Sequence, residues 1–546
     1  MIGRRKIFTG TFVHTPSPTT LSILENAAIF VDQSGTIIHI DSDASSPDAR
    51  LNNDLEEWSG AEIIFTRPSR NEFFFPGFVD THIHASQYPN VGLFGKSSLL
   101  NWLEIYTFPL EASLADTDKA RRVYGRCIAR TLANGTTTAA YYATRSVEST
   151  NLLVDLCLKS GQRAFVGRCC MDQNAPDYYR DADPEASVRD TETCVEHCRQ
   201  VDPERKLVCP IVTPRFGPSC SAKLLEGLGG LAKRENLPVQ THISENKAEV
   251  ELVQALFPAS KSYADVYDVA GLLHDRTILA HAIHLTDEEI ELIRARDAKI
   301  SHCPVSNLAL TSGCAKVKAL MKKGIKVGLG TDMSGGYSPS ILESVRQATL
   351  VSRMVALVDG EEAKLSVTEA LYLATKGGAD VVGLGGKIGA FEIGMQWDAI
   401  MVGMGNVPEE VVPESEPEVS RKRPKSELEP EVSRKRPKSE SDKGEDAEME
   451  DGLLPFASLG SEDEASNGVN GEEAAKDGES TPLIPGIEFG LDDGPVDIFG
   501  FENWEEKVAK WVYNGDDRNT VNVWVAGAEV YRAGGIPPIW SLDLTS

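Results

Sequence analysis

Short apolar runs alternate with helical patterns over most of the chain, from residue 73 to about residue 384. Eight runs have the length and composition of buried strands: 75–80, 135–142, 164–171, 208–214, 238–242, 277–281, 298–302 and 326–332. This alternation predicts parallel strands joined by crossover helices. Eight such units favour an α/β fold built as an eight-stranded parallel barrel, rather than an open sheet.

Both ends of the chain carry a different pattern, one of short strands and turns. Residues 27–32 and 36–40 flank a Gln-Ser-Gly turn, and residues 521–527 give a further strand and turn signal. We therefore expect a small β-sandwich domain that both chain ends build together, beside the barrel. The expected segments of the two domains are 1–75, 391–404 and 496–546 for the small domain and 76–390 for the barrel.

Residues 405–495 interrupt the C-terminal β region with an acidic, Ser- and Gly-rich insert that we predict to be disordered. The chain holds 55 Lys and Arg against 82 Asp and Glu, a formal charge of −27. Residues 401–500 hold 26 of the acidic and 10 of the basic residues, so more than half of the excess is local. A chain this acidic lacks the basic face that nucleic-acid binding requires.

The insert contains a tandem repeat, in which the sequence EPEVSRKRPKSE occurs at 416–427 and again at 429–440. Its basic runs, 421–425 and 434–438, would suit an import receptor, and the protein would then be nuclear as well as cytoplasmic. The alternative, which we favour, is a solvated and duplicated low-complexity segment.

Cysteine usage and the absence of long apolar runs indicate a cytoplasmic protein with no membrane contact. The first ten residues are not followed by the apolar stretch of a secretory signal, and no run of about 18 apolar residues indicates a membrane span. The ten cysteines are scattered, as in proteins of a reducing compartment. Cys194 and Cys198 flank His197, but no second ligand pair matches them, which disfavours a metal site there.

Candidate metal ligands stand at the C-terminal ends of the predicted strands. His82 and His84 lie two apart in one strand, so their side chains point to the same face. His242 and Asp332 each end a further run. The carboxyl ends of barrel strands meet at one mouth, so these four residues would offer three nitrogens and one oxygen to a single zinc or ferrous ion.

Further residues at the same ends are candidates for catalysis by a water molecule that such a metal acidifies. Asp332 would hold the water and take its proton, and Glu245 would pass a proton to the substrate. His281 would hydrogen-bond the attacking water, or alternatively bind a second metal. Two-metal barrels commonly use a bridging lysine at the mouth of the fourth strand. The lysine of that strand, Lys206, stands at the opposite end, which favours one metal.

These residues and their surroundings resemble the amidohydrolase superfamily, and within it the guanine deaminase family. The matching stretches are PGFVDTHIHASQYPN (76–90), NGTTTAAYYAT (134–144), GQRAFVGRCCMD (161–172), PIVTPRFGPSCS (210–221), QTHISENKAEVE (240–251), HCPVSNLALTSG (302–313), VGLGTDMSGGYSPS (327–340) and YNGDDRNTVNVWVAG (513–527). The resemblance covers about residues 1–404 and 495–546, and the family pattern lacks the insert.

The resemblance implies a homodimeric enzyme with one Zn²⁺ per chain that hydrolyses guanine to xanthine and ammonia. It implies that zinc is held by His82, His84, His242 and Asp332, with Glu245, Asp332 and His281 as the catalytic residues. It implies a guanine site formed by Gln87, Arg215, Phe216, His242, Glu245 and Asp332. The chemistry agrees, since the Arg215 guanidinium can donate to a purine carbonyl and the Phe216 ring offers a flat apolar wall.

Three alternatives stay open at this point. The enzyme could be a related aminohydrolase that acts on another purine, a pterin or a triazine. A barrel without activity, used as a binding scaffold, is disfavoured because all four ligand candidates and both proton-handling carboxylates are present. The aromatic-rich stretch 99–112 is either a lid or subunit contact over the pocket or an ordinary packed helix.

Overall fold

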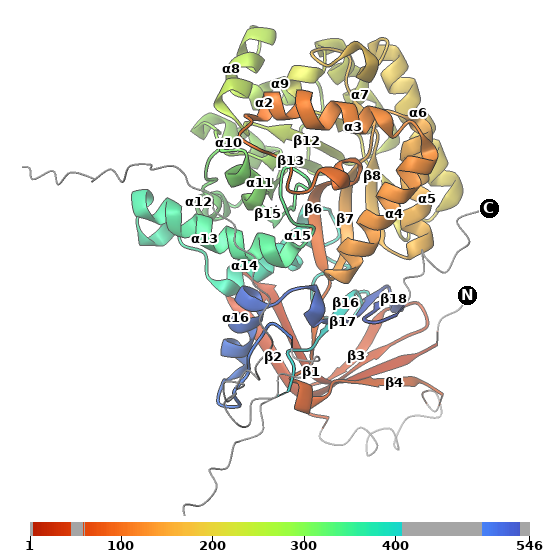
Figure 1. The fold of residues 1–546 in the computed structure, drawn as a ribbon, viewed down its shortest axis with the longest axis vertical. Helices are drawn as coiled ribbons and strands as arrows, with labels where there is room; N and C mark the ends of the chain where they lie inside the picture. The colour runs from red at the N-terminus through yellow and green to blue at the C-terminus, as the bar shows by residue number, and fades with distance from the viewer. Residues whose placement is uncertain (1–3, 45–57, 59, 407–493, 536–546) are drawn as a thin grey trace, which may run out of the picture. The chain divides into compact units, whose positions relative to one another are not determined.

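The computed structural model describes residues 4–44, 58, 60–406 and 494–535. The expectations about the insert, its disorder and its basic repeats fall outside the described residues. The described chain has a mixed α/β architecture, in which a layer of parallel strands wrapped by helices adjoins a second, mainly antiparallel sheet (Figure 1).

All eight apolar runs contain a strand with a parallel neighbour. The runs 164–171 and 208–214 are each split into two short strands, and the run 75–80 spans the end of β5 (Phe73–Pro76), which belongs to the second sheet, and the start of β6 (Phe78–His84). In sheet order the parallel strands are β10 (Val208–Pro210), β8 (Arg163–Gly167), β7 (Thr136–Tyr142) and β6 (Phe78–His84); β11 (Thr213–Pro214) and β9 (Cys169–Cys170); and β12 (Val239–Ile243), β13 (Thr277–His281), β14 (Lys299–His302) and β15 (Val327–Leu329).

The hydrogen-bonded ladders divide these strands into three sheets instead of the single barrel sheet that the sequence predicts. Pro210 and Pro214 have no N–H to donate, so the fourth run pairs with the fifth only through isolated bridges, one of them between Val212 and Val239. At the other edge, the Asp332 N–H donates to the His82 carbonyl oxygen at 2.9 Å and ties the end of β15 to β6.

Helices follow most of the parallel strands, and polar side chains cap the beginnings of many of them. Asp116, Ser146 and Ser221, for example, each accept backbone N–H groups of the first helical turn. The longer helices are α4 (Thr117–Ala133), α5 (Val147–Ser160), α6 (Pro184–Val201), α7 (Ala222–Glu235), α8 (Lys247–Leu256), α9 (Tyr263–Val269), α10 (Asp287–Ala295), α13 (Ile341–Asp359), α14 (Val367–Ala374) and α16 (Trp504–Asn514). Short helices are α2 (Leu99–Trp102), α3 (Phe108–Ser113), α11 (Pro304–Ala309), α12 (Val317–Lys322) and α15 (Lys376–Val381). None of the helices in the described ranges is long and apolar enough to cross a membrane.

The second sheet takes strands from both ends of the chain. Its order is β18 (Ala528–Arg532), β17 (Thr520–Val525), β16 (Ala399–Val402), β5 (Phe73–Pro76), β1 (Lys6–Ser17), β2 (Thr20–Val31) and β3 (Ile37–Asp41), with β4 (Glu62–Phe65) also paired to β1. It is one eight-stranded sheet where the sequence predicts a two-sheet sandwich, because the long strand β1 pairs with β2, β4 and β5 and so joins the two halves.

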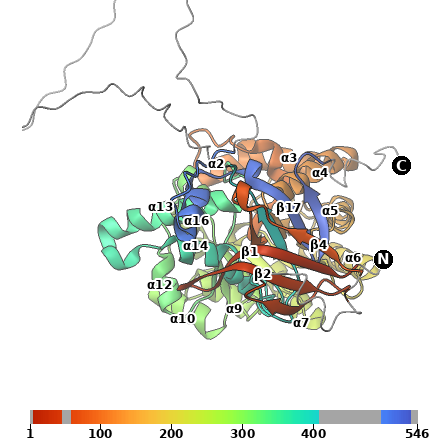
Figure 2. The ribbon, with the colours of Figure 1, turned by 90° about the horizontal axis from the view of Figure 1, so that it is seen from below.

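Aromatic side chains connect the second sheet to the first parallel strand. Phe8 stacks on Trp397 with ring centroids 4.0 Å apart in the core of that sheet. Trp511 of α16 stacks on Phe78 and meets Phe75 edge-on, with centroids 6.0 and 5.2 Å away. Figure 2 shows α16 beside α13, which it contacts. The start of β6 is thereby fixed, and β6 carries two of the candidate ligands.

Candidate active site

Four of the sequence-predicted residues converge on one point at the C-terminal ends of the parallel strands. His82 and His84 come from β6, His242 from β12, and Asp332 from the turn after β15, and one ligand atom from each lies within 4.8 Å of the others. Asp332 Oδ1 is 3.1 Å from His82 Nε2 and 3.3 Å from His84 Nε2. The His84 and His242 Nε2 atoms are 3.3 Å apart. We call these four residues the ligand group.

Backbone geometry holds the ligand group in place. Asp332 and His281 have positive φ values of 45° and 72°, which are costly for residues other than glycine and are found mostly where function requires them. The neighbouring Thr331 donates from its hydroxyl to Asp80 Oδ2 at 2.6 Å and from its N–H to Asp80 Oδ1 at 3.1 Å. The buried Asp80 carboxylate thus fixes the turn that aims Asp332.

The donor set suits a divalent metal ion. Three imidazoles and a carboxylate are the ligands that zinc and ferrous iron take in proteins. His242 Nδ1–H donates a hydrogen bond to the Arg215 carbonyl oxygen at 2.6 Å, so His242 Nε2 keeps its lone pair toward the other ligands. Burial lowers the pKa of His82 to about 4 and that of His242 well below its ordinary value, which keeps both rings in the neutral, metal-binding form.

Asp332 stays ionised in spite of its burial. Burial by itself would raise the pKa of its carboxyl group, but the contacts with His82 and His84 outweigh burial and hold the pKa well below its usual range. Ser306 adds a hydroxyl that donates to Asp332 Oδ2 at 2.5 Å. The carboxylate can therefore act as a ligand and accept a proton.

Glu245 and His281 lie next to the ligand group and contact each other. Glu245 Oε2 is 3.5 Å from His281 Nε2, which is itself 3.8 Å from Asp332 Oδ2. Burial raises the pKa of Glu245 to about 7, so this carboxyl group can both give and take a proton near neutral pH. Burial would lower the pKa of His281, but the carboxylates of Glu245 and Asp332 outweigh it and raise the pKa.

A small cavity beside the ligand group holds the predicted substrate residues. Its volume is about 20 Å³, room for about one water molecule. Gln87, Arg215, Phe216 and Glu245 line it, together with the apolar residues Leu99, Trp102, Leu103 and Leu310. Residues 99–103 therefore cover the pocket, and this part of the 99–112 stretch has the position of a lid.

Arg215 forms a buried salt bridge and also lines the cavity. Its Nη1 donates to Glu111 Oε2 at 2.7 Å and its Nη2 to Glu111 Oε1 at 3.3 Å. Gln87 and Tyr179 donate to the same carboxylate, at 2.8 and 2.7 Å. Glu111 is fully buried, and although burial would raise its pKa, Arg215 outweighs burial and lowers it.

Four residues of this site have no role in the sequence prediction. Glu111 lies in the 99–112 stretch, where it is one of two acids among apolar residues and carries no other signal. Ser306, Asn307 and Ser312 lie in the matched motif 302–313. Asn307 Oδ1 accepts from His281 Nδ1 at 2.8 Å, and Ser312 donates to Glu245 Oε1 at 3.1 Å, so this loop orients both proton-handling residues.

A second group of potential ligands shares one residue with the first. His82, His281 and Cys303 also place ligand atoms within 4.8 Å of one another. The bridging lysine of two-metal barrels has no counterpart here, because Lys206 lies at the opposite end of its strand, is 73% exposed and pairs with Glu204 at 2.8 Å.

Comparison with known proteins places this fold and site in a class. The model of the amidohydrolase family matches residues 73–426. The fold and the buried His and Asp residues thus define an amidohydrolase, and the chain belongs to that family.

Within the family, the chain belongs with the guanine deaminases. It is 49% identical to the probable guanine deaminase of Schizosaccharomyces pombe over 404 residues, covering 72% of this chain and 75% of the relative. It is 44% identical to the human guanine deaminase over 398 residues, covering 72% and 86%. The crystal structure of Clostridium acetobutylicum guanine deaminase with bound guanine superposes with a TM-score of 0.73 at 31% identity, covering 97% of this chain and all of that one.

Proposed function

We propose that the protein is a guanine deaminase that hydrolyses guanine to xanthine and ammonia. The observation that carries this proposal is the ligand group with Glu245 and His281 beside it, at a cavity lined by Gln87, Arg215 and Phe216. The identity of 44–49% to guanine deaminases over about 400 residues supports the same substrate.

The ligand group would hold one zinc ion per chain. When bound, the ion supplies Lewis-acid activation of a water molecule. All four residues of the ligand group would bind the ion. His281 would not be a ligand, because its Nδ1 contacts Asn307 and its Nε2 faces Glu245. The uneven donor set, three imidazoles and one carboxylate, favours zinc over calcium or magnesium, which prefer oxygen ligands.

Three residues handle protons in this proposal. Asp332, ionised, takes a proton from the attacking water, and His281 hydrogen-bonds that water. Glu245, with a pKa of about 7, transfers a proton to a ring nitrogen of guanine and so makes the ring carbon electrophilic. The carbon–nitrogen bond to the exocyclic amine then breaks, the amine takes up a proton and leaves as ammonia, and the water oxygen becomes the new carbonyl of xanthine.

Gln87, Arg215 and Phe216 would recognise the purine. Arg215 has donors left over from its pair with Glu111 for the carbonyl oxygen of guanine, and Gln87 offers an amide to the ring nitrogens. Glu111 is a positioning residue in this scheme, because its two oxygens hold the Arg215 and Gln87 side chains in one arrangement. The cavity of about 20 Å³ must enlarge to admit guanine, and we propose that residues 99–103 move as its lid.

The finer architecture is also a proposal. The strand order and the tie between β15 and β6 support a closed eight-stranded barrel over 76–390, with 1–75, 391–404 and 496–546 as the small β domain.

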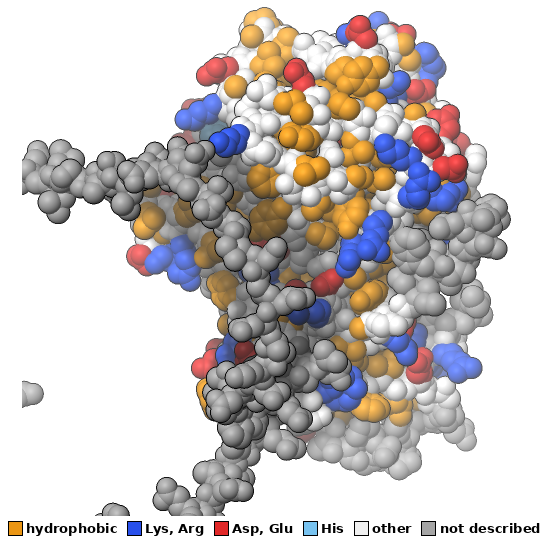
Figure 3. All heavy atoms as spheres, in the orientation of Figure 1, with side chains coloured by type: hydrophobic (Ala, Val, Ile, Leu, Met, Phe, Trp, Pro, Cys, Tyr) orange, Lys and Arg blue, Asp and Glu red, His pale blue; other side chains and the backbone are white. Residues whose placement is uncertain are grey.

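Figure 3 shows hydrophobic side chains gathered on the face that carries α2 and α3, where Leu93 and Ile105 are 50% and 60% exposed. We propose that the protein is cytoplasmic and that it forms a homodimer. Light scattering of the purified chain would test the dimer.

Ammonia release from a substrate panel tests the proposed function. Purified, zinc-loaded protein is incubated with guanine, adenine, cytosine and pterin, and ammonia is quantified by a coupled assay. We expect release from guanine with an equal amount of xanthine. Faster release from pterin or adenine would identify a related aminohydrolase instead, and no release from any compound would point to the scaffold.

A further inference from the structure

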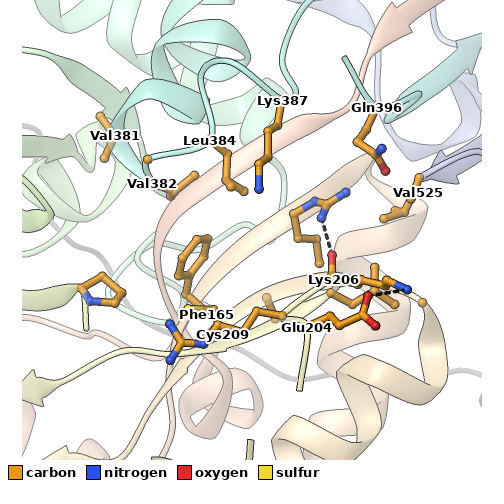
Figure 4. A pocket seen from close by; sticks show the side chains of 18 of the residues that line it. Phe165, Glu204, Lys206, Cys209, Val381, Val382, Leu384, Lys387, Gln396 and Val525 are labelled. Atoms are coloured by element: carbon orange, nitrogen blue, oxygen red, sulfur yellow. Dashed lines mark hydrogen bonds and ion pairs between the residues drawn. The ribbon is translucent and has the colours of Figure 1, made fainter. Parts of the chain in front are cut away.

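A second and larger cavity lies at the opposite end of the parallel strands, between their N-terminal ends and the eight-stranded sheet (Figure 4). Its volume is about 810 Å³, within the usual range of small-molecule sites. Pro238, just before β12, lines it, whereas His242 in the same strand belongs to the ligand group. Four residues of extended chain separate the two by about 13 Å. The cavity is therefore distinct from the active site.

Most of the charged residues on the wall of this cavity are cations, although the whole chain has a formal charge of −27. The charged residues that line it are Arg163, Arg205, Lys206, Arg276, Lys387 and Glu204. Two of the cations are neutralised: Arg163 pairs with Asp398 at 3.2 Å and Lys206 with Glu204 at 2.8 Å. The remaining three have no carboxylate partner within the ranges that the structure describes.

These three cations face the same space from different elements. Arg276 is oriented by the Asn236 carbonyl oxygen, to which it donates at 2.8 Å. Burial raises the pKa of the Cys209 thiol on the cavity wall to about 11, and the guanidinium groups of Arg205 and Arg276 both oppose that rise, so both lie near Cys209. Lys387 comes from the facing wall and points into the space between (Figure 4).

The rest of the lining is mostly apolar, with the amide of Gln396 and the hydroxyl of Ser34. Phe165 and Ile278 come from the parallel strands, and Val382 and Leu384 from the segment after α15. Figure 4 shows Leu384 and Gln396 directed toward the wall that carries Phe165. The Gln396 amide nitrogen donates to Thr36 at 3.1 Å, and its oxygen accepts no hydrogen bond from the residues that the structure describes.

We propose that this cavity binds a nucleoside monophosphate, with the phosphate among Arg205, Arg276 and Lys387 and the base against Phe165 and Leu384. Arginine and lysine side chains are the usual phosphate ligands in proteins, and an aromatic and aliphatic wall suits a flat base. The Gln396 oxygen is an acceptor for a base amino group. The site is independent of the deamination proposed above, because it rests on different residues.

Two simpler occupants fit the lining less well. Inorganic phosphate would satisfy the cations but would leave most of the 810 Å³ and the whole apolar wall unused. A fatty acid would cover the apolar wall, but its single carboxylate would leave part of the cationic cluster uncompensated and would give the Gln396 amide oxygen no donor. A phosphate joined to a polar, flat base satisfies all three kinds of lining.

Isothermal titration calorimetry on the full chain tests the proposal, with GMP, AMP, guanosine, inorganic phosphate and octanoate as probes. Xanthine is kept saturating so that the active site is occupied. We expect GMP or AMP to bind with one site per chain, and guanosine and phosphate to bind at least tenfold more weakly. The double variant Arg205→Ala/Lys387→Ala should lose at least tenfold in affinity. Lys364→Ala, which removes a lysine paired with Glu361 elsewhere, is the matched control and should change nothing.

A second variant keeps the proposal testable if the double variant fails to fold. Leu384→Trp should occupy the space beside Phe165 that the base would take and so weaken nucleotide binding at least tenfold, while the KM for guanine and the unfolding midpoint stay unchanged. The proposal is overturned if nucleotides do not bind at millimolar concentration, if octanoate or phosphate binds as tightly as GMP, or if GMP binding survives both the double variant and Leu384→Trp. Loss of deaminase activity with intact GMP binding would refute only the proposed function.

Discussion

The two ends of the parallel strands use charge in opposite ways. At the C-terminal end, the carboxylates of Asp332 and Glu111 are buried and fully engaged by histidine and arginine side chains. At the N-terminal end, Arg205, Arg276 and Lys387 surround a cavity about forty times larger and contact no carboxylate of the described residues. A catalytic site needs its charges fixed before the substrate arrives, whereas a site for an anion leaves the countercharge to the ligand.

Burial explains why the first arrangement requires partners. An unpaired charge inside a protein costs several kcal/mol, and removing one partner of a buried pair costs about 3–5 kcal/mol. Arg215 and Glu111 are 3% and 0% exposed, so removing either one would leave the other as an unpaired buried charge. The cations at the opposite end remain solvated and need no partner in the unbound protein.

Removing the metal should produce the largest effect and should affect only one end. Dialysis against a zinc chelator should reduce guanine turnover at least ~10³-fold, because Lewis-acid activation of water is lost, and added zinc should restore it. Nucleotide binding at the N-terminal cavity should not change. Elemental analysis of the untreated protein should give about one zinc per chain, and two tightly bound ions would contradict the single-metal assignment.

Glu245→Gln should have the second-largest effect on guanine turnover. The variant keeps the shape of the side chain and the four metal ligands but cannot carry a proton, so kcat should fall by about 10²–10⁴-fold with zinc content unchanged. Ser312→Ala, which removes only the hydrogen bond to Glu245 Oε1, serves as the mild comparison and should lose less than about tenfold. Steady-state rates near those of the unmodified protein would exclude Glu245 from proton transfer.

Glu111→Gln should weaken substrate binding more than catalysis. Arg215 would lose its countercharge, and one of the two carboxylate oxygens that accept from Arg215, Gln87 and Tyr179 would be replaced by a donating NH2 group, so KM for guanine should rise at least ~10-fold while kcat falls less. Glu111→Asp should recover part of the loss, and Tyr179→Phe, which removes one hydrogen bond to Glu111, should have a small effect. A lower unfolding midpoint with unchanged KM would mean that Glu111 is only structural.

The buried His14 of the second sheet should make stability depend on pH. Burial lowers its pKa from 6.5 to about 4, and its Nδ1 accepts the Phe391 N–H at 3.2 Å. Since the unfolded chain binds this proton more readily, the stability that His14 contributes is present above pH 6.5 and is lost as the pH falls toward 4, by up to ~3 kcal/mol. His14→Asn keeps an acceptor, and urea unfolding between pH 7 and 4 should show a flatter profile for it. Parallel profiles for both proteins would rule out this role.

Deleting residues 405–495 should have the smallest effect. The sequence predicts this insert to be disordered, and it lies far along the chain from every residue of the ligand group. Guanine turnover and the unfolding midpoint should stay within about twofold and a few degrees of those of the full chain, since disordered segments bury little apolar surface. A deletion variant that aggregates or unfolds would show that the segment is structural.

The sequence predicts the strands and the ligand candidates because both depend on local patterns. Eight apolar runs mark the strands, and the alternation of side chains puts His82 and His84 on one face. It does not predict the break between the fourth and fifth strands, which depends on where Pro210 and Pro214 fall in the ladder, or the single eight-stranded sheet. It also misses Glu111, which is 104 residues from Arg215 along the chain and meets it only in the folded structure.

The cavity at the N-terminal end lies beyond the reach of sequence reasoning for a similar reason. The three cations that lack a carboxylate partner come from the loops before β10 and β13 and from the segment after α15, and each of them resembles an ordinary surface residue on its own. Only their assembly around Phe165 and Leu384 gives them a common ligand.

Simultaneous measurement of ammonia and xanthine, with guanine and the zinc-loaded protein, tests the central claim most directly. The two products should form at equal rates, both rates should fall by about 10²–10⁴-fold with Glu245→Gln, and GMP binding at the opposite end should persist in that variant. Absence of xanthine, or near-normal turnover with Glu245→Gln, would contradict the assignment of catalysis to the C-terminal end of the strands.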